Sequence, residues 1–185
     1  MAQRKLVVPQ AIGTVLEIGI GTGLNLPFYD PSQVDRVIGL DPSHTSWKLA
    51  ASRAANCKFP IEFIGLPDDR IPLDDESVDT VLITYSLCTI PDPVSALHGI
   101  AKVMKPSAQL IFCEHGIAPD SKVAKWQNRL NPIWNRFAGG CDLNRDIPEL
   151  IVAGGFRIES QETGYLEGIP KFANFNYWGR ATWEG

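Results

Sequence analysis

The stretch Thr14-Val-Leu-Glu-Ile-Gly-Ile-Gly-Thr-Gly-Leu-Asn25 decides the fold class of this 185-residue chain. Residues 14–18 are mostly β-branched or apolar and predict a buried strand, and glycines follow at positions 19, 21 and 23. Glycine lets the backbone turn sharply and lets a ligand lie against bare main chain, where helix N–H groups attract anionic groups. We therefore expect a strand, a ligand-binding turn and a short helix over residues 23–29.

An acidic residue closes the second expected strand. Asp41 is the last residue of this strand, which is expected over residues 36–41. A carboxylate there can accept hydrogen bonds from both hydroxyls of a ribose. Glu17 adds an acid at the end of the first strand, where it suits a positively charged part of a ligand. A dinucleotide fingerprint would need glycine at Leu24, and no Tyr-x-x-x-Lys pair is recognisable, so an NAD-linked oxidoreductase is disfavoured. A purely structural glycine turn is the other alternative.

Short apolar runs alternate with helix-like stretches along the rest of the chain, which is typical of βαβ units and a mostly parallel sheet. Further strands are expected at residues 61–66, 78–85 and 109–114, and an antiparallel pair at 156–162 and 176–183. Helices are expected at 43–55, 93–104 and 121–137, and from Asp146 to the glycines at 154 and 155. Ser43 and Asp146 are expected caps, Pro106 stops the helix before it, and Pro132 should kink or divide its helix.

Composition points to one ordinary globular domain over residues 1–185. The 17 Lys and Arg are scattered and the formal net charge is −4, which argues against a nucleic-acid partner and favours a small-molecule or protein substrate. Because there is neither a signal-peptide core nor an apolar run of 18 residues, we expect a cytoplasmic protein without a transmembrane segment. The four cysteines, Cys57, Cys88, Cys113 and Cys141, form no metal-ligand or redox spacing, so no metal is expected.

Three motifs carry a family resemblance that covers nearly the whole chain. Residues 15–25, the stretch Gly39-Leu-Asp-Pro-Ser43 and residues 71–79 resemble the successive motifs of class I S-adenosylmethionine-dependent methyltransferases of the UbiE-like, type 11 group. Gly139-Gly-Cys-Asp-Leu-Asn-Arg145 is similar to the methyltransferase-like thiol methyltransferases, whereas bacterial phospholipid N-methyltransferases look similar in the first motif only. The resemblance implies a Rossmann-like α/β fold with helices on both faces of a seven-stranded sheet, in the order 3-2-1-4-5-7-6 with strand 7 antiparallel.

The resemblance also implies a donor site for S-adenosylmethionine, which becomes S-adenosylhomocysteine. Asp41 would hold the ribose, Pro42 and Ser43 would border the adenine, and Asp68 or its neighbour Asp69 would lie near the adenine amino group. The residues expected around the methionine part are Glu17, Gly19, Gly21, Gly23 and Asn25, with Tyr85 and Ser86 completing the donor site.

The acceptor should meet residues after the fourth and fifth strands, because ligands of open α/β sheets bind outside the carboxyl ends of the strands. These are residues 85–89 and 114–116, among which His115 and Tyr85 are the catalytic candidates; His115 is alternatively a hydrogen-bonded loop residue. The polar cluster Cys141, Asp142, Asn144 and Arg145 either borders the pocket or stabilises a chain reversal. The aromatics Trp126, Trp134, Phe172, Phe175, Tyr177 and Trp178 suit either an apolar acceptor or the core.

These residues predict methyl transfer to a small, fairly apolar acceptor: a thiol, a quinone precursor or a lipid amine. The alternative is an inactive donor-binding regulatory or partner subunit. Only 13 residues precede the first expected strand, so the N-terminal helices that cover the donor in related methyltransferases are expected to be absent. We then expect an open donor cleft that a second subunit of a homodimer covers, or else a start site placed too far downstream.

Overall fold

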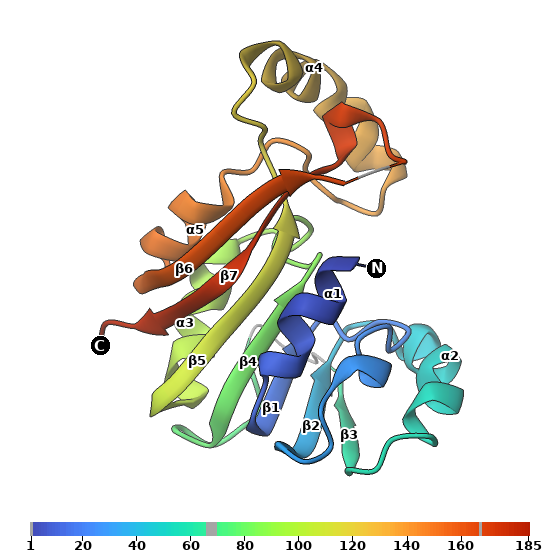
Figure 1. Cartoon of the computed structure of the whole chain (residues 1–185), viewed down its shortest axis with the longest axis vertical. Coiled ribbons are helices and arrows are strands. Elements are labelled where there is room, and N and C mark those ends of the chain that lie inside the picture. The colour runs from blue at the N-terminus through green and yellow to red at the C-terminus, as the bar shows by residue number, and fades with distance from the viewer. Residues whose placement is uncertain (1, 66–69, 167) are drawn as a thin grey trace.

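The computed structural model describes residues 2–65, 70–166 and 168–185, and its centre is one twisted sheet (Figure 1). The strands are β1 (Gly13–Ile18), β2 (Val34–Leu40), β3 (Ile61–Ile64), β4 (Val78–Thr84), β5 (Met104–His115), β6 (Phe156–Tyr165) and β7 (Phe175–Trp183). Their order is β3-β2-β1-β4-β5-β7-β6, and β7 runs antiparallel to both β5 and β6. The expected fold class and strand order are confirmed.

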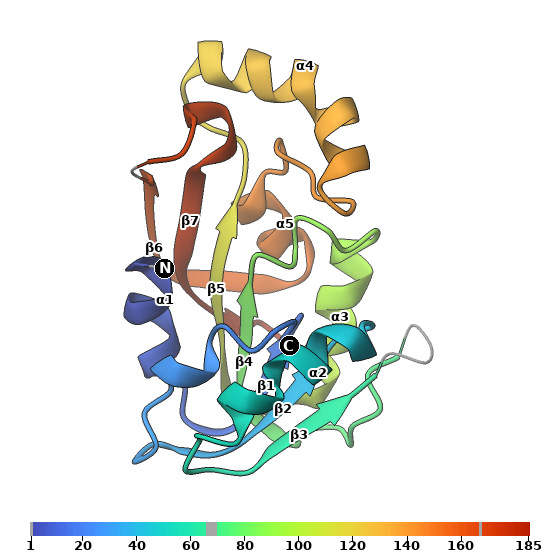
Figure 2. The same ribbon diagram turned by 90° about the vertical axis from the view of Figure 1, so that its right-hand side faces the viewer.

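Helices cover both faces of the sheet (Figure 2). α1 (Ala2–Val7) and α2 (His44–Ala54) lie on one face, and α3 (Pro93–Val103) and α5 (Ile147–Ala153) on the other, while α4 (Ser121–Phe137) extends beyond the carboxyl ends of the strands. Three short 3₁₀ turns complete the described elements: η1 (Val8–Gln10), η2 (Leu26–Phe28) and η3 (Lys171–Ala173). Among the residues that the structure describes, no helix has the length and apolar character needed to cross a membrane.

Alternating side chains in the central strands build two separate cores, one under each helical layer. In β1, Leu16 packs with the α3 and α5 side, whereas Val15 packs with the α1 side. β5 repeats this alternation, since Phe112 joins the first core and Ile111 the second, and both are completely buried. A strand that is apolar in both directions is the signature of a sheet covered on both faces, as the runs in the sequence predicted.

The structure moves several expected boundaries. β5 begins at Met104 rather than at 109, because an irregularity in its pairing with β4 accommodates Pro106, a residue that cannot donate to a regular ladder. The helix expected over residues 23–29 is reduced to η2, and α4 continues through Pro132 as one helix. The caps are as expected: Ser43 accepts from Ser46 N–H at 3.2 Å, and Asp146 accepts from Glu149 N–H at 3.1 Å.

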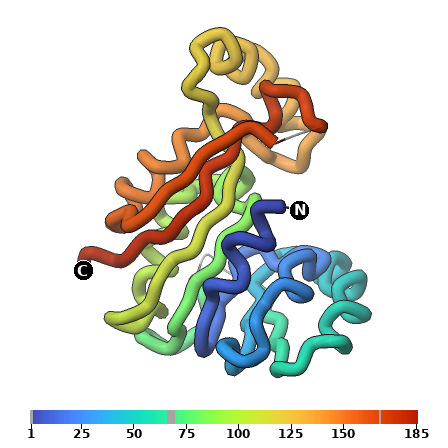
Figure 3. The backbone as a smooth tube through the Cα atoms, viewed as in Figure 1, coloured from blue at the N-terminus to red at the C-terminus, as the bar shows by residue number. Residues whose placement is uncertain are grey.

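Sequence reasoning did not predict α1. This helix crosses one face of the sheet, where it contacts β5 and β7 (Figure 3). Val7 and Val8 are 1% and 0% exposed and join the second core, so burial of apolar side chains holds the segment in place. As a result, the side chain of Arg4 reaches the region just beyond the first glycine turn.

Candidate active site

The glycine turn after β1 presents bare main chain, as expected. Gly19, Gly21 and Gly23 have φ values of 69°, 52° and 72°, a region that L-residues with a Cβ rarely adopt. A Cβ built on Gly19 would lie 2.1 Å from Ser86 Oγ, so a side chain has no room there. The N–H of Gly19 donates to the carbonyl of Leu40 at 2.7 Å, which ties the turn to the end of β2.

Asp41 follows β2 and faces this turn. Its Oδ2 accepts from the N–H of Gly21 at 2.8 Å, and its Oδ1 accepts from the N–H of Ser43 at 2.8 Å. Each carboxylate oxygen has two lone pairs, so both remain able to accept another hydrogen bond. The carboxylate is 9% exposed and therefore stands fixed and available at the carboxyl edge of the sheet.

A cavity of about 810 Å³ lies at this edge of the sheet. Its wall mixes polar and apolar side chains and consists of Ile18, Gly19, Leu40, Asp41, Pro42, Ile71, Tyr85, Ser86, Thr89, Ile90, Pro91, Asp92, Ser95, Ala96, Gly99, Ile100 and Gly139. Five expected donor residues line it: Gly19, Asp41, Pro42, Tyr85 and Ser86. The expected adenine contacts Asp68 and Asp69 lie outside the described residues.

Glu17 and Asn25 are brought together behind the turn. Glu17 is 1% exposed; its Oε2 accepts from the Tyr29 hydroxyl at 2.7 Å and its Oε1 from Asn25 Nδ2 at 2.9 Å. Burial raises the pKa of Glu17 to about 7, although both hydrogen bonds oppose the shift. The acid is therefore poised to change charge near neutral pH.

Arg4 completes this network and is the site residue that sequence reasoning missed. Its guanidinium donates to Asn25 Oδ1 and, at 2.8 Å, to Thr84 Oγ1, and it lies 5.1 Å from the centre of the Tyr85 ring. No local pattern around residue 4 signals this role, because the contact depends on how α1 packs across the sheet.

The loop after β4 is held by a buried carboxylate. Glu114 is fully buried, and its Oε1 accepts from the N–H groups of Ser86 at 2.6 Å and Leu87 at 3.1 Å, while Oε2 accepts from Cys88 N–H at 3.4 Å. Burial raises the pKa of Glu114, and the three N–H donors act in the opposite direction. Glu114 thus fixes the loop that separates the donor cavity from the end of β5.

The catalytic candidates Tyr85 and His115 lie side by side, with stacked rings whose centres are 6.5 Å apart. His115 Nε2 lies 3.1 Å from Cys141 Sγ, and Cys88 Sγ adjoins them, so that the three atoms lie within 4.8 Å of one another. Contacts with Cys88 and His115 lower the pKa of the Cys141 thiol well below its ordinary value, although burial acts in the opposite direction. Burial lowers the pKa of His115, but its contacts with Cys141 outweigh burial and raise it. This environment favours a thiolate beside an imidazolium.

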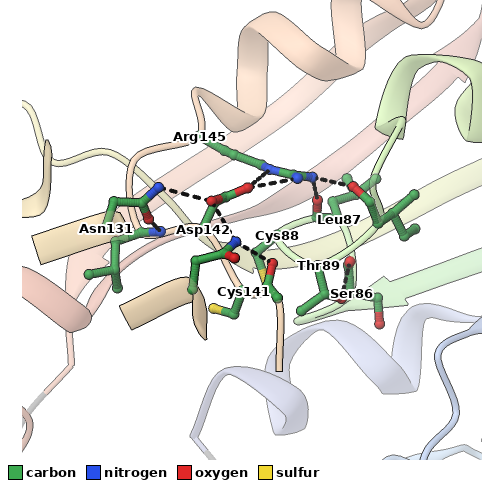
Figure 4. A network of polar contacts seen from close by, with 12 residues as sticks. Ser86, Leu87, Cys88, Thr89, Asn131, Cys141, Asp142 and Arg145 are labelled. Carbon is green, nitrogen blue, oxygen red and sulfur yellow. Dashed lines mark hydrogen bonds and ion pairs between the residues drawn. The ribbon is translucent and has the colours of Figure 1, made fainter. Parts of the chain in front are cut away.

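The polar cluster near Asp142 acts as a clamp (Figure 4). Asp142 forms an ion pair with Arg145 at 2.8 Å and accepts from the amides of Asn131 and Asn135 at 2.9 Å each. Arg145 also donates to the carbonyls of Leu87 and Ile90, and Asp142 N–H donates to the carbonyl of Cys88 at 2.8 Å. The cluster therefore joins the loop after β4 to the chain after α4. Asn144 instead pairs with Asn128 at the surface.

The expected aromatics divide between core and surface. Phe175 and Tyr177 are buried in the core, Trp134 packs edge-on against Phe172, and Trp126 is 56% exposed.

Comparison with known proteins identifies the family. Residues 16–112 match the family model described as a methyltransferase domain, and they contain the glycine turn, Asp41 and the loop after β4. The chain belongs to this methyltransferase family, whose methyl donor is S-adenosylmethionine, and the cofactor expected from the sequence is thereby confirmed.

Curated relatives include thiol methyltransferases. The chain is 37% identical over 136 residues to the thiol S-methyltransferase TMT1B of Homo sapiens, a match that covers 71% of this chain and 55% of that protein. It is 30% identical over 105 residues to a phosphatidylethanolamine N-methyltransferase of Cereibacter sphaeroides, covering 56% of this chain and 51% of that protein. The chain thus spans about half the length of these relatives.

Solved structures share the fold. A S-adenosylmethionine-dependent methyltransferase from Methanosarcina mazei has a TM-score of 0.71 at 20% identity, covering 94% of this chain and 93% of that one. The cyclase SpnF has a TM-score of 0.75 at 16% identity, covering 100% of this chain and 80% of that one. Since these identities are low, the likeness concerns the fold and not the acceptor.

Proposed function

We propose that this protein transfers a methyl group from S-adenosylmethionine to the sulfur of a small, largely apolar thiol. The observation that carries the proposal is that one cavity is lined both by residues that suit the donor and by a residue next to His115. We assign the donor to the part lined by Gly19 and Asp41, the donor end, and the acceptor to the part lined by Tyr85, which stacks on His115, the acceptor end. Family membership supports the reaction class, and the named thiol S-methyltransferases support the acceptor class.

The residues at the donor end fit S-adenosylmethionine. The two free lone pairs of Asp41 suit the ribose hydroxyls, Pro42 and Ser43 suit the adenine border, and Glu17 with Asn25 suits the amino-acid part. Gly19 and Gly21 leave the main chain bare beside them. The donor supplies a methyl group on a positively charged sulfur, and this chain supplies its alignment with the acceptor and the exclusion of water.

A thiol fits the acceptor end better than a lipid amine or a quinone precursor. Ile71, Ile90 and Ile100 make part of the cavity wall apolar, which suits an apolar acceptor of any of these classes. His115 and the cysteines next to it, however, favour a negatively charged sulfur, the nucleophilic form of a thiol. We propose that His115 promotes this thiolate form and that Tyr85 is the wall against which the acceptor lies.

Production of S-adenosylhomocysteine with matched acceptors tests the function. An alkyl thiol, the corresponding alkyl amine and a hydroquinone should be compared at equal concentration with the full chain. We expect turnover with the thiol to exceed turnover with the amine by at least about 100-fold, because the amine gains nothing from a thiolate-favouring site. Donor binding without turnover on any acceptor would support the inactive partner subunit instead, and preferential turnover of the hydroquinone would contradict the thiol.

Two wider properties belong to the same proposal. We propose that a second copy of the chain covers the donor cleft in a homodimer and that the protein works in the cytoplasm on a small molecule rather than on nucleic acid. Light scattering with and without S-adenosylhomocysteine tests the first, and cell fractionation tests the second. A relative in Saccharomyces cerevisiae is named as mitochondrial, which makes the fractionation informative.

A further inference from the structure

We propose that Cys88, His115 and Cys141 form a zinc site with three protein ligands and a fourth position open to the acceptor thiol. The inference rests on the proposed thiol methyltransferase function for its role, but the site itself rests on the side-chain cluster alone. Their Sγ, Nε2 and Sγ atoms lie within 4.8 Å of one another.

The atoms are spaced for one ion. In a tetrahedral Zn²⁺ site with bonds of the usual length, a sulfur and a nitrogen ligand lie about 3.6 Å apart. Two sulfur ligands lie about 3.8 Å apart. The observed separation of 3.1 Å between Cys141 Sγ and His115 Nε2 needs to widen by only about 0.5 Å. Two thiolates and one imidazole are a ligand set that prefers zinc over harder ions such as Mg²⁺.

The ligands sit on a rigid support, as a metal site requires. Glu114 anchors the N–H of Cys88, and Asp142 N–H donates to the carbonyl of Cys88 at 2.8 Å, so the two cysteine loops are joined to each other. Arg145 pairs with Asp142 at 2.8 Å and holds the Leu87 carbonyl next to Cys88 (Figure 4). This clamp fixes the backbone next to Cys88 and next to Cys141.

The cluster adjoins the cavity through its neighbours, although its three side chains are not part of the cavity wall. Ser86 and Thr89, on either side of Cys88 in the chain, line the cavity, as does Gly139 close to Cys141. Tyr85, also in the cavity wall, stacks on the His115 ring. His115 and Cys141 are half-buried, so the group is not sealed inside the core. Three protein ligands at the edge of a cavity are the pattern of a catalytic zinc site with an exchangeable position.

Zinc there would explain how a thiol loses its proton in an apolar pocket. On binding, the acceptor's S–H bond breaks, a zinc–sulfur bond forms and the proton passes to solvent; no group is oxidised or reduced. Zn²⁺ with two cysteinate ligands is neutral overall, and the added acceptor thiolate makes the group singly negative. A negative group next to the cavity attracts the positively charged sulfur of the donor.

Cobalt(II) is the probe for the site. The full chain, stripped with a chelator under reducing conditions, should bind about one Co²⁺ with a thiolate-to-metal absorption band in the near ultraviolet, and Zn²⁺ should abolish the band. We expect Cys88→Ser and Cys141→Ser each to weaken Co²⁺ binding by about 100-fold or more and His115→Asn to shift the band. Cys57→Ser is the matched control, because Cys57 is not part of the cluster and its thiol donates to the carbonyls of Leu26 and Arg53.

Several results would overturn the site. One is Co²⁺ binding by the unmodified chain without a thiolate band, and another is equal Co²⁺ binding by the unmodified chain and by Cys141→Ser. A third is a Cys88–Cys141 disulfide in a protein that takes up no metal even after full reduction. S-adenosylhomocysteine binding, measured in the same samples, separates misfolding from loss of ligands.

The role of the metal is separable from the proposed function. Metal-free protein should methylate an alkyl thiol at least about tenfold more slowly than zinc-loaded protein at neutral pH, with a smaller difference at pH 9, where the free thiol ionises by itself. Equal rates with and without zinc would overturn this role while leaving thiol methylation intact. A metal-loaded protein that methylates no thiol would instead contradict the proposed function and leave the site standing.

Discussion

At the scale of single residues, the carboxylate of Asp41 joins the two halves of the donor site. Its two oxygens take one N–H from the turn after β1 and one from the start of α2. Both bonds hold the group in one orientation before any ligand arrives, so binding costs little further ordering. The lone pairs that stay free on the two oxygens can accept hydrogen bonds from two adjacent hydroxyls. The site therefore prefers a ribose to a sugar that lacks them.

Asp41→Ala should weaken S-adenosylhomocysteine binding by about 100-fold, because two hydrogen bonds to a charged acceptor are together worth about 3 kcal/mol. Isothermal titration calorimetry measures the effect. Asp35→Ala is the control, since Asp35 lies exposed near the start of β2, the strand that Asp41 follows. An unchanged affinity in Asp41→Ala would show that Asp41 does not bind the ribose.

Glu17 should make the stability of the protein depend on pH. Its pKa is about 7 in the folded chain and has the ordinary value of 4.5 when unfolded, so the folded chain binds the proton more tightly. The stabilisation is complete below pH 4.5 and is lost as the pH rises through 7, by about 3 kcal/mol in total. Glu17→Gln should remove this loss.

Urea unfolding at intervals between pH 4.5 and 8 tests that expectation. The difference between the unmodified chain and Glu17→Gln isolates Glu17, because all other titrating groups are common to both. Glu62→Gln, at an exposed position of β3, should follow the unmodified chain. Parallel curves for the unmodified chain and Glu17→Gln would show that Glu17 titrates normally.

At the scale of elements, the geometry of the glycine turn and Asp41 was predictable from local sequence, whereas the clustering of Cys88, His115 and Cys141 was not. The strand, glycine turn, second strand and Asp41 follow one another within residues 13–41, so local sequence order carries their geometry. Cys88 lies in the loop after β4, His115 at the end of β5 and Cys141 after α4, and only the packing of the sheet and of α4 brings them together. Local spacing therefore predicted no metal ligands.

The short elements η2 and α1 were also not predictable from local sequence. Residues 23–29 have the glycine, proline and asparagine of a chain that turns, and only the 3₁₀ turn η2 forms, while the Asn25 side chain bonds to Glu17 and Thr84. Arg4 reaches the site through α1, whose apolar residues find their partners on β5 and β7. Such contacts depend on tertiary packing, which overrides the weak local preferences of six residues.

The turn after β1 predicts a sharp contrast between two glycines. Gly19→Ala should lower the free energy of unfolding by at least about 2 kcal/mol and abolish donor binding, because its φ is 69° and its new Cβ would meet Ser86 Oγ at 2.1 Å. Gly99→Ala, in the middle of α3, meets nothing within 4 Å and should stabilise the protein by about 0.5–1 kcal/mol. Chemical denaturation compares the pair; equal effects would contradict the close approach of the turn to Ser86.

At the scale of the whole molecule, the order of the strands determines where the ligand-binding site forms. The sheet grows in opposite directions from β1, towards β2 and β3 on one side and towards β4 and β5 on the other. The connections leave β1 and β4 on opposite sides and open a crevice at the carboxyl edge, the place where open α/β sheets bind ligands. The cavity, Asp41 and the acceptor loop all lie there, so a ligand in the cavity contacts both halves of the sheet.

A ligand that bridges both halves should stabilise the entire domain. S-adenosylhomocysteine at about 100 times its dissociation constant should add about 2.7 kcal/mol to the free energy of unfolding, which corresponds to a rise in melting temperature of about 5–10 °C for a domain of this size. NADH at the same concentration should produce no shift, since Leu24 replaces the glycine that its pyrophosphate site needs. Differential scanning calorimetry gives both numbers, and Asp41→Ala should lose most of the shift while keeping its own melting transition. A shift with NADH as large as that with S-adenosylhomocysteine would mean that the crevice selects a dinucleotide, and the methyl donor would have to be abandoned.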